Sequence, residues 1–161
     1  MTKAVVSLAP PVQAELMQDD GNVLLATFDV PFDSAAAAFA VDAAVESNRT
    51  LIIANVVELP PLPMSIAMGS DMLEYTPELA ASLLAPAELA CSLGVKVERL
   101  RVKSFRRVDA LVELASERNI RLLVLGPDRD KVSKRLYNKA AKAVRERLDC
   151  LVWVTWDLPP S

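Results

Sequence analysis

Hydrophobic and polar residues are distributed along the chain in two distinct repeats. Some short runs, such as 51–57 (LIIANVV), are apolar at nearly every position, which indicates strands buried on both faces. Between such runs, apolar residues recur every three or four positions, as in Val108, Leu111 and Val112, which is typical of helices with one buried face. The expected strands are 23–28, 51–57, 95–103, 120–125 and 151–156, and the expected helices are 34–47, 77–93, 108–118 and 134–148. The sequence therefore predicts the order βαβαβαβαβ.

Residues that favour helix ends support these boundaries. Asp33 or Ser34 can cap the first helix, and Thr76 followed by Pro77 is a typical helix start. Asn119 can take the left-handed conformation that closes the third helix.

Strands joined by single helices form a parallel sheet that helices cover on both faces, with right-handed connections. We therefore expect a doubly wound α/β fold. The apolar positions of strand 95–103 slip by one residue between Val97 and Leu100, which predicts either a bulge or a position at the sheet edge. The pattern does not determine the strand order, on which the place of a ligand depends.

The composition removes several classes of enzyme. The 161 residues suit one domain, and a hydrophobic content of 52% supplies a sizeable core. The sequence has no histidine, which excludes Ser-His-Asp, Cys-His and histidine-metal sites. The closest two of its four glycines, Gly69 and Gly94, lie 25 positions apart, which excludes a dinucleotide-binding GxGxxG motif and a P-loop.

The chain shows no pattern for export or membrane insertion. Pro10 and Pro11 interrupt its first apolar stretch, and no apolar run approaches the roughly 20 residues of a membrane helix. Cys91 and Cys150 lack metal-binding or redox spacing, so we interpret them as buried small hydrophobic residues. These features predict a cytoplasmic protein without membrane insertion.

The net charge of −3 conceals two halves of opposite sign. Residues 1–95 hold two basic and twelve acidic side chains, a formal charge of −10, whereas residues 96–161 hold sixteen basic and nine acidic ones, a formal charge of +7. Half of these sixteen basic residues lie between Arg129 and Arg147. We interpret them as a solvated helix face, with a surface for a phosphate or an acidic partner as the alternative. Nucleic acid is not an expected partner, because no nucleic-acid-binding motif accompanies the run.

Several local motifs together resemble the universal stress protein family. They are VLLATFDVPFDS at the first strand, GVKVERLRV before the third helix, VDALVELASERNIRLLVLG across the third helix and fourth strand, and LDCLVWVTW at the last strand. The resemblance runs from Asn22 to Trp156, which leaves residues 1–21 as an amino-terminal extension of a domain formed by 22–161. It implies a five-stranded sheet of order 3-2-1-4-5 and a homodimer formed through the last strands.

The resemblance also implies a ligand crevice between the loop 29–34 and the loop that begins at Gly126, where nucleotide-binding members hold ATP. In those members the second loop reads Gly-x2-Gly-x9-Gly-Ser/Thr, and its glycines let backbone N–H groups surround the phosphates. Here Arg129 replaces the second glycine, and the final pair is Lys139-Ala140 or, if one loop residue is missing, Asn138-Lys139. We therefore expect ATP binding to be weak or absent. The candidate binding residues are Asp29, Val57, Gly126, Lys134, Asn138 and Lys139.

Three functional hypotheses fit these residues. The first is a non-catalytic stress-response or regulatory homodimer that acts through protein contacts with an unknown partner and needs no cofactor. The second is a sensor for a mononucleotide or cyclic nucleotide, such as an adenine nucleotide, with Asp29 at one end of the crevice and the basic stretch at the other. The third is an enzyme or phosphoacceptor in which Asp29, Asp128 and Asp130 hold Mg²⁺, an arrangement that the neighbouring basic residues oppose.

The last strand has a physical reason to pair with a second copy of the chain. The run 151–156 (LVWVTW) is apolar, and at a sheet edge its unpaired backbone groups would invite another strand. The candidate interface residues are Val152, Trp153, Val154 and Trp156. In the alternative interpretation, the two tryptophans cover the last helix.

Two connections are further candidate partner surfaces. Phe105-Arg106-Arg107 is expected to be an exposed loop. In the connection 58–75, Met64, Met68 and Met72 recur every four residues and are expected to pack on the domain or on a partner subunit.

Overall fold

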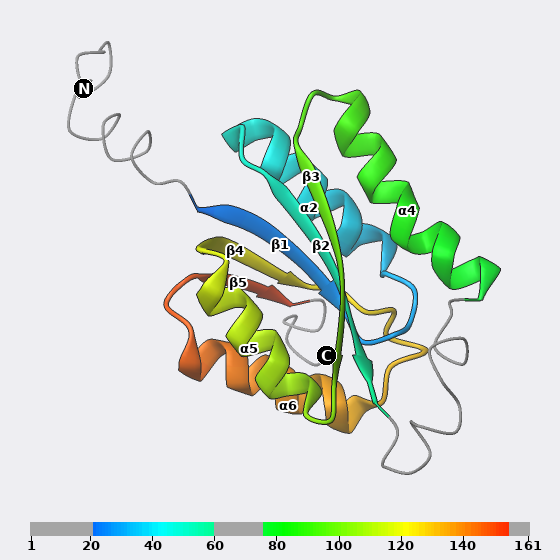
Figure 1. Ribbon diagram of the computed structural model, residues 1–161, viewed down its shortest axis with the longest axis vertical. Coiled ribbons are helices and arrows are strands. Elements are labelled where there is room, and N and C mark those ends of the chain that lie inside the picture. Colours follow the sequence, from blue (N-terminus) through cyan, green and yellow to red (C-terminus); the bar gives the residue numbers. More distant parts are fainter. Residues whose placement is uncertain (1–20, 60–75, 155–161) are drawn as a thin grey trace, which may run out of the picture.

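The computed structural model describes residues 21–59 and 76–154 (Figure 1). Its strands form one parallel sheet in the order β3-β2-β1-β4-β5. They are β1 (Asn22–Thr27), β2 (Leu51–Glu58), β3 (Val97–Ser104), β4 (Ile120–Leu125) and β5 (Leu151–Val154). The order reverses between β1 and β4, so the carboxyl ends of these two strands flank the point where ligands bind in sheets of this kind.

The helices of the described residues follow β1 to β4 in turn. They are α2 (Ser34–Ser47), α4 (Pro77–Ser92), α5 (Arg107–Glu117) and α6 (Lys134–Arg147). The Asp33 carboxylate caps α2 by accepting from the N–H of Ala36 at 3.0 Å, and the Thr76 hydroxyl caps α4. Asn119 follows α5 with a φ of 55°. The predicted helix starts and the left-handed closure are therefore confirmed.

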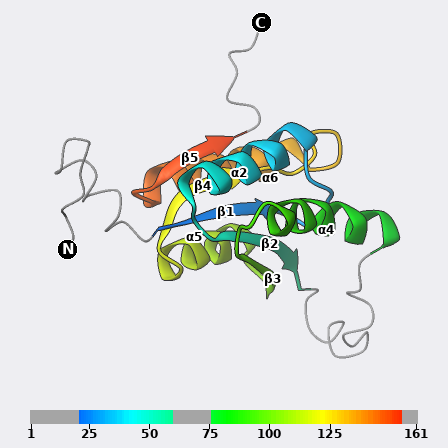
Figure 2. The same ribbon diagram turned by 90° about the horizontal axis from the view of Figure 1, so that it is seen from above.

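Two buried clusters form the core, one on each face of the sheet. One cluster joins α5 and α6 to residues such as Leu24 and Ile52, and the other joins α2 and α4 to residues such as Val23 and Ile53. Neighbouring residues of β1 and β2 thus point to opposite layers, as strands covered on both faces require. Figure 2 shows α4 and α5 on opposite sides of the sheet.

The structure confirms the predicted fold class and the strand order 3-2-1-4-5. It also decides between a bulge and an edge position for β3. This strand pairs with β2 from Leu51↔Val97 to Glu58↔Ser104 without a register shift, so the edge position is correct and the bulge is wrong. Val95, which we included in the strand, is buried before β3 begins.

The interpretation of the cysteines is corrected in part. Cys91 is exposed, because it lies on the face of α4 that points away from the sheet, whereas Cys150 is half-buried. Burial raises the pKa of the Cys150 thiol. No helix among the described residues is long and apolar enough to cross a bilayer. Most of the extension 1–21, the methionines at 64, 68 and 72, and Trp156 lie outside the described residues.

Candidate functional site

The loops that follow β1 and β4 are joined by their backbones. The N–H of Asp33 donates to the carbonyl of Gly126 at 2.8 Å, and the N–H of Asp128 donates to the carbonyl of Pro31 at 2.8 Å. Phe32 and Pro127 form an antiparallel bridge between these two contacts. The family resemblance implied a crevice between these loops, and these contacts hold the two loops side by side.

Gly126 is required by packing. A Cβ atom at this position would lie 2.7 Å from the Cβ of Ala36 in α2 and 3.3 Å from the Cδ1 of Leu25 in β1. The N–H of Gly126 donates to the carbonyl of Ala26 at 3.0 Å, which holds the backbone against β1. The close approach of α2 is therefore enough to explain why this position is a glycine, and the explanation does not need a bound phosphate.

The loop after Gly126 uses backbone donors within the protein. The N–H groups of Lys131 and Val132 donate to the carbonyl of Asp128 at 3.0 and 3.1 Å, and the N–H of Asp130 donates to the Asp128 carboxylate at 2.9 Å. Val132 is buried and anchors the loop to the core. These N–H groups close a turn around Asp128, whereas a phosphate nest needs them to point at the ligand.

Asp29 is held by Asn55 of β2. The N–H of Asp29 donates to Oδ1 of Asn55 at 2.6 Å, and Nδ2 of Asn55 donates to the Asp29 carboxylate at 3.3 Å. Asn55 is 1% exposed, and Asp29 has a φ of 61°, a left-handed conformation that aspartate tolerates. Asn55 was not among the residues predicted from the sequence, although a single polar residue within the apolar run 51–57 was a signal for it.

The other candidate binding residues are divided between β2 and α6. Val57 is buried near the end of β2. Lys134 begins α6, whereas Asn138 and Lys139 lie in its second turn, and all three of these side chains are exposed. The hydroxyl at the start of α6 belongs to Ser133, which accepts from the N–H of Leu136 at 3.0 Å. The residue count from Gly126 placed the final pair of the family loop at 138–140, and so Ser133 was not predicted as the hydroxyl at the start of α6.

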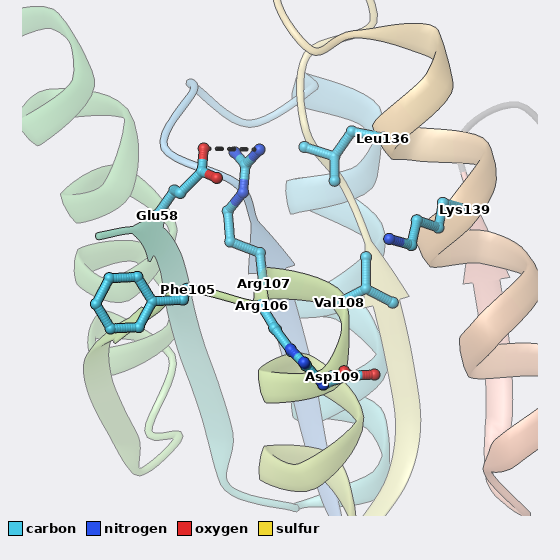
Figure 3. Close-up of a pocket in the computed structure, with 8 residues that line it drawn as sticks. All are labelled: Glu58, Phe105, Arg106, Arg107, Val108, Asp109, Leu136 and Lys139. Atoms are coloured by element: carbon cyan, nitrogen blue, oxygen red, sulfur yellow. Dashed lines mark ion pairs between the residues drawn. The ribbon is translucent and has the colours of Figure 1, made fainter. Parts of the chain in front are cut away.

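A cavity of about 340 Å³ lies between the end of β2, the start of α5 and α6 (Figure 3). Lys139 reaches into it from α6, and Arg107 forms an ion pair there with Glu58 at 3.3 Å. Its apolar wall includes Val108 and Leu136. Its lining residues are Glu58, Phe105, Arg106, Arg107, Val108, Asp109, Leu136 and Lys139. The structure therefore brings Lys139 together with the predicted exposed loop 105–107, and Asp29 does not line this cavity.

One carboxylate of the cavity is held by a basic side chain of α6. A guanidinium nitrogen of Arg147 lies 2.8 Å from the carboxylate of Asp109 in α5. This hydrogen bond, with the nearby charges of Arg106 and Lys139, holds the pKa of Asp109 below its ordinary value. Asp109 is therefore ionised near neutral pH, and it reduces the positive charge of the cavity.

Two of the three aspartates of the magnesium hypothesis accept hydrogen bonds through their carboxylates. Asp29 contacts Asn55, whereas the Asp128 carboxylate accepts from the N–H of Asp130. Within the part of the chain that the structure describes, no three histidine, cysteine or carboxylate side chains form a group that could hold a metal ion.

The outer edge of β5 carries the described part of the predicted interface. Val154 is buried, while Val152 and Trp153 are half-buried and the neighbouring Leu151 is 63% exposed. The Trp153 ring stacks on Phe39 of α2 with centroids 5.0 Å apart. Trp153 thus packs on α2. The alternative interpretation, in which it covers the last helix, is wrong for this residue.

The sequence profile of the universal stress protein family matches residues 21–155. The chain belongs to this family. No curated protein matches the sequence of this universal stress protein.

Solved structures of universal stress proteins share its fold. One, in complex with cAMP, is 24% identical, with a TM-score of 0.56 over 86% of this chain and 98% of that chain. UspA from Lactobacillus plantarum is 17% identical, with a TM-score of 0.60 over 83% and 96%. A protein from Archaeoglobus fulgidus in complex with dAMP is 14% identical, with a TM-score of 0.55 over 84% and 98%.

Proposed function

We propose that this universal stress protein is a non-catalytic regulatory protein of the cytoplasm that acts as a homodimer through protein contacts and does not bind ATP. The observation that carries the proposal is the closed turn around Asp128, whose N–H groups bond within the protein where a triphosphate would need open donors. The absence of histidine from the sequence supports a role without catalysis. Free Cys91 and Cys150 suit a reducing compartment.

Basic side chains are a poor substitute for the missing backbone donors. Lys134, Arg135 and Lys139 are exposed on α6, and fixing such long side chains around a triphosphate costs rotamer entropy that a preformed loop does not lose. Asp128 and Asp130 add negative charge beside the same loop. We therefore expect the affinity for ATP to be negligible at millimolar concentration.

A thermal-shift titration with Mg²⁺ and ATP tests this part of the proposal. A ligand present at one hundred times its Kd stabilises a protein by about 2.7 kcal/mol, which raises the melting temperature of a domain of this size by roughly 5–10 °C. We expect no rise with millimolar ATP. A rise of several degrees would contradict the proposal.

A sensor for a mononucleotide is the second candidate function, and the cavity beside α5 favours it. Its volume of about 340 Å³ is at the low end of ligand sites, and Arg106, Arg107 and Lys139 supply positive charge for one phosphate. Two solved universal stress proteins of the same fold are complexes with cAMP and dAMP. A single phosphate needs fewer donors than the tail of ATP.

The same titration with AMP and cAMP distinguishes the two candidates. If the cavity is a sensor site, AMP raises the melting temperature and Lys139→Ala abolishes the rise, whereas Lys142→Ala, an exposed lysine of α6 that does not line the cavity, preserves it. If the protein acts only through protein contacts, neither nucleotide changes the melting temperature.

A further inference from the structure

The helices on the two faces of the sheet differ in charge. Helices α2 and α4 contain acidic residues and no basic residue. Helix α6 contains six basic residues and one acidic residue, Glu146. Because α2 and α4 pack on one face of the sheet and α6 packs on the other, the sheet separates these acidic helices from the basic one. Folding therefore does not bring α2 or α4 to α6 to neutralise it.

Three basic side chains form one row along the outside of α6. Arg135, Lys139 and Lys142 follow one another at spacings of four and three residues, which places them on one side of the helix. All three are exposed, and Tyr137 and Val144 bury the opposite side of α6 in the core. We call these three residues the basic row. The buried side fixes the helix, so the row presents its charges over about 10 Å, at about 1.5 Å per residue.

The basic row is not neutralised within the protein. It forms no ion pair within residues 21–59 and 76–154. Arg147 of the same helix, by contrast, lies 2.8 Å from the carboxylate of Asp109. Like charges at spacings of three and four residues destabilise the helix that carries them. An anionic partner on the row would relieve this repulsion.

Carboxylates border the basic row and limit the width of an occupant. Helix α5 packs beside α6 (Figure 1), and its Glu113 and Glu117 are exposed. Glu146 follows Lys142 at helical spacing and ends the row. A broad anionic surface, such as a membrane or a nucleic acid, would approach these carboxylates as well, and like charges repel. An occupant as narrow as one helix can follow the row alone.

We propose that the basic row of α6 is a docking surface for an acidic helix of a partner protein, which carries carboxylates at positions i, i+4 and i+7. This inference rests on the proposed role through protein contacts and names the chemistry of the partner. Helix α6 offers no open strand edge, so the partner segment has to satisfy its own backbone, as a helix does. Exposed ion pairs are individually weak, so selection requires that all three charges be matched together.

A second copy of the chain matches the basic row less well. In α2, Asp42 and Glu46 are two exposed carboxylates four positions apart, and the two carboxylates of α4 lie at its opposite ends. In α5, Glu113 and Glu117 have the required spacing, but the third carboxylate of that helix, Asp109, already pairs with Arg147. None of these helices offers three unpaired carboxylates to the row.

NMR on the ¹⁵N-labelled full-length protein tests the proposal. The probe is an alanine-based peptide of about 18 residues, long enough to form a helix, with glutamates at positions i, i+4 and i+7. The control peptide has the same composition, with its glutamates five positions apart so that they point in different directions around the helix. Both are titrated at low ionic strength, where exposed charges are least screened. The shifts of backbone amides report both the affinity and the place of binding.

We expect the first peptide to shift the amides of α6 and to bind at least about fivefold more tightly than the control peptide. The double variant Arg135→Glu and Lys142→Glu should weaken binding by about tenfold. Neither of these residues lines the cavity beside α5, so the variant leaves that site intact. The matched variant Arg99→Glu and Lys103→Glu reverses two exposed charges of β3 and should change binding by less than about twofold. The spectrum of each variant shows whether it is folded.

Several results would overturn the proposal. Equal binding of the two peptides would mean that net charge alone attracts the probe. Equal effects of the two double variants, or shifts outside α6, would place the site elsewhere. Tighter binding of anionic lipid vesicles or duplex DNA to α6 would assign the row to a broad anionic surface. Loss of the dimer in Arg135→Glu and Lys142→Glu, measured by sedimentation, would assign it to a second copy.

The thermal-shift titration with ATP separates this inference from the proposed function. If the peptide does not bind and ATP does not stabilise the protein, only the acidic helix is refuted. If ATP stabilises the protein while the peptide binds to α6, the docking surface stands and the proposed lack of ATP binding is wrong.

Discussion

Gly126 shows how one residue can be conspicuous in the sequence for one reason and required in the structure for another. As the first residue of a family-like loop, it suggested contact with a phosphate. In the structure, the space for its Cβ atom is taken by Ala36 of α2. The close approach of this helix is enough to exclude a side chain at this position.

We predict that Gly126→Ala destabilises the protein by about 1–3 kcal/mol, because the added methyl group would lie 2.7 Å from the Ala36 Cβ. Removing that methyl group with Ala36→Gly should make Gly126→Ala less costly. Chemical denaturation of the two single variants and the double variant measures this coupling. Equal cost of Gly126→Ala in both backgrounds would show that the packing explanation is wrong.

Asn55 shows that the sequence can reveal a buried polar residue without revealing its hydrogen-bond partner. A polar side chain inside LIIANVV is visible in the sequence, but the sequence does not say which group it satisfies. The partner is the N–H and carboxylate of Asp29, 26 positions earlier in the chain. Asp29 could be identified as a candidate from the sequence. Its contact with Asn55, however, depends on the register of β1 against β2.

At the scale of elements, the start of α5 and the end of α6 are linked across the surface. Arg147 lies in the last turn of α6 and contacts Asp109 in the first turn of α5. The sequence predicted both helices closely, but it did not predict that these two residues meet. The contact depends on how the two helices cross on the same face of the sheet.

We predict that the Asp109 carboxyl titrates below its ordinary pKa of 3.8 in the folded protein and closer to that value in Arg147→Gln. Because the folded pKa is the lower one, the contact stabilises the protein at neutral pH and is lost as the pH falls through the folded pKa. NMR titration of the Asp109 side chain measures the change. Lys142→Gln is the control on the same helix, and an equal change in that variant would contradict the assignment.

At the scale of the whole molecule, the sheet has two edges of different chemistry. β3 is a long edge with arginines and a lysine on one face, whereas β5 is a short edge made of Leu151, Val152, Trp153 and Val154. A basic edge disfavours pairing with its own copy, and an apolar edge favours it. The two edges therefore differ in how readily each would pair with a second copy of the chain.

We predict that the protein is a dimer in solution and that Leu151→Asp shifts it to a monomer, because the carboxylate would be placed at the β5 interface. Leu151 is 63% exposed in the single chain, so the substitution spares the core. Leu93→Asp changes a leucine that is 52% exposed at the end of α4 and should leave the dimer intact. Sedimentation velocity measures both variants, and a monomeric wild-type protein would refute the prediction.

The sequence by itself determined which segments are strands and helices, because burial on one or both faces imposes a repeat that can be read locally. It also determined that a glycine-rich phosphate loop is missing, since that loop is a contiguous motif. Only the tertiary structure decided that the loops after β1 and β4 bond to each other, that Asn55 holds Asp29, and that Lys139 shares a cavity with the loop before α5. These facts join residues far apart in the chain, and their contacts depend on strand register and helix crossing, which no local pattern encodes.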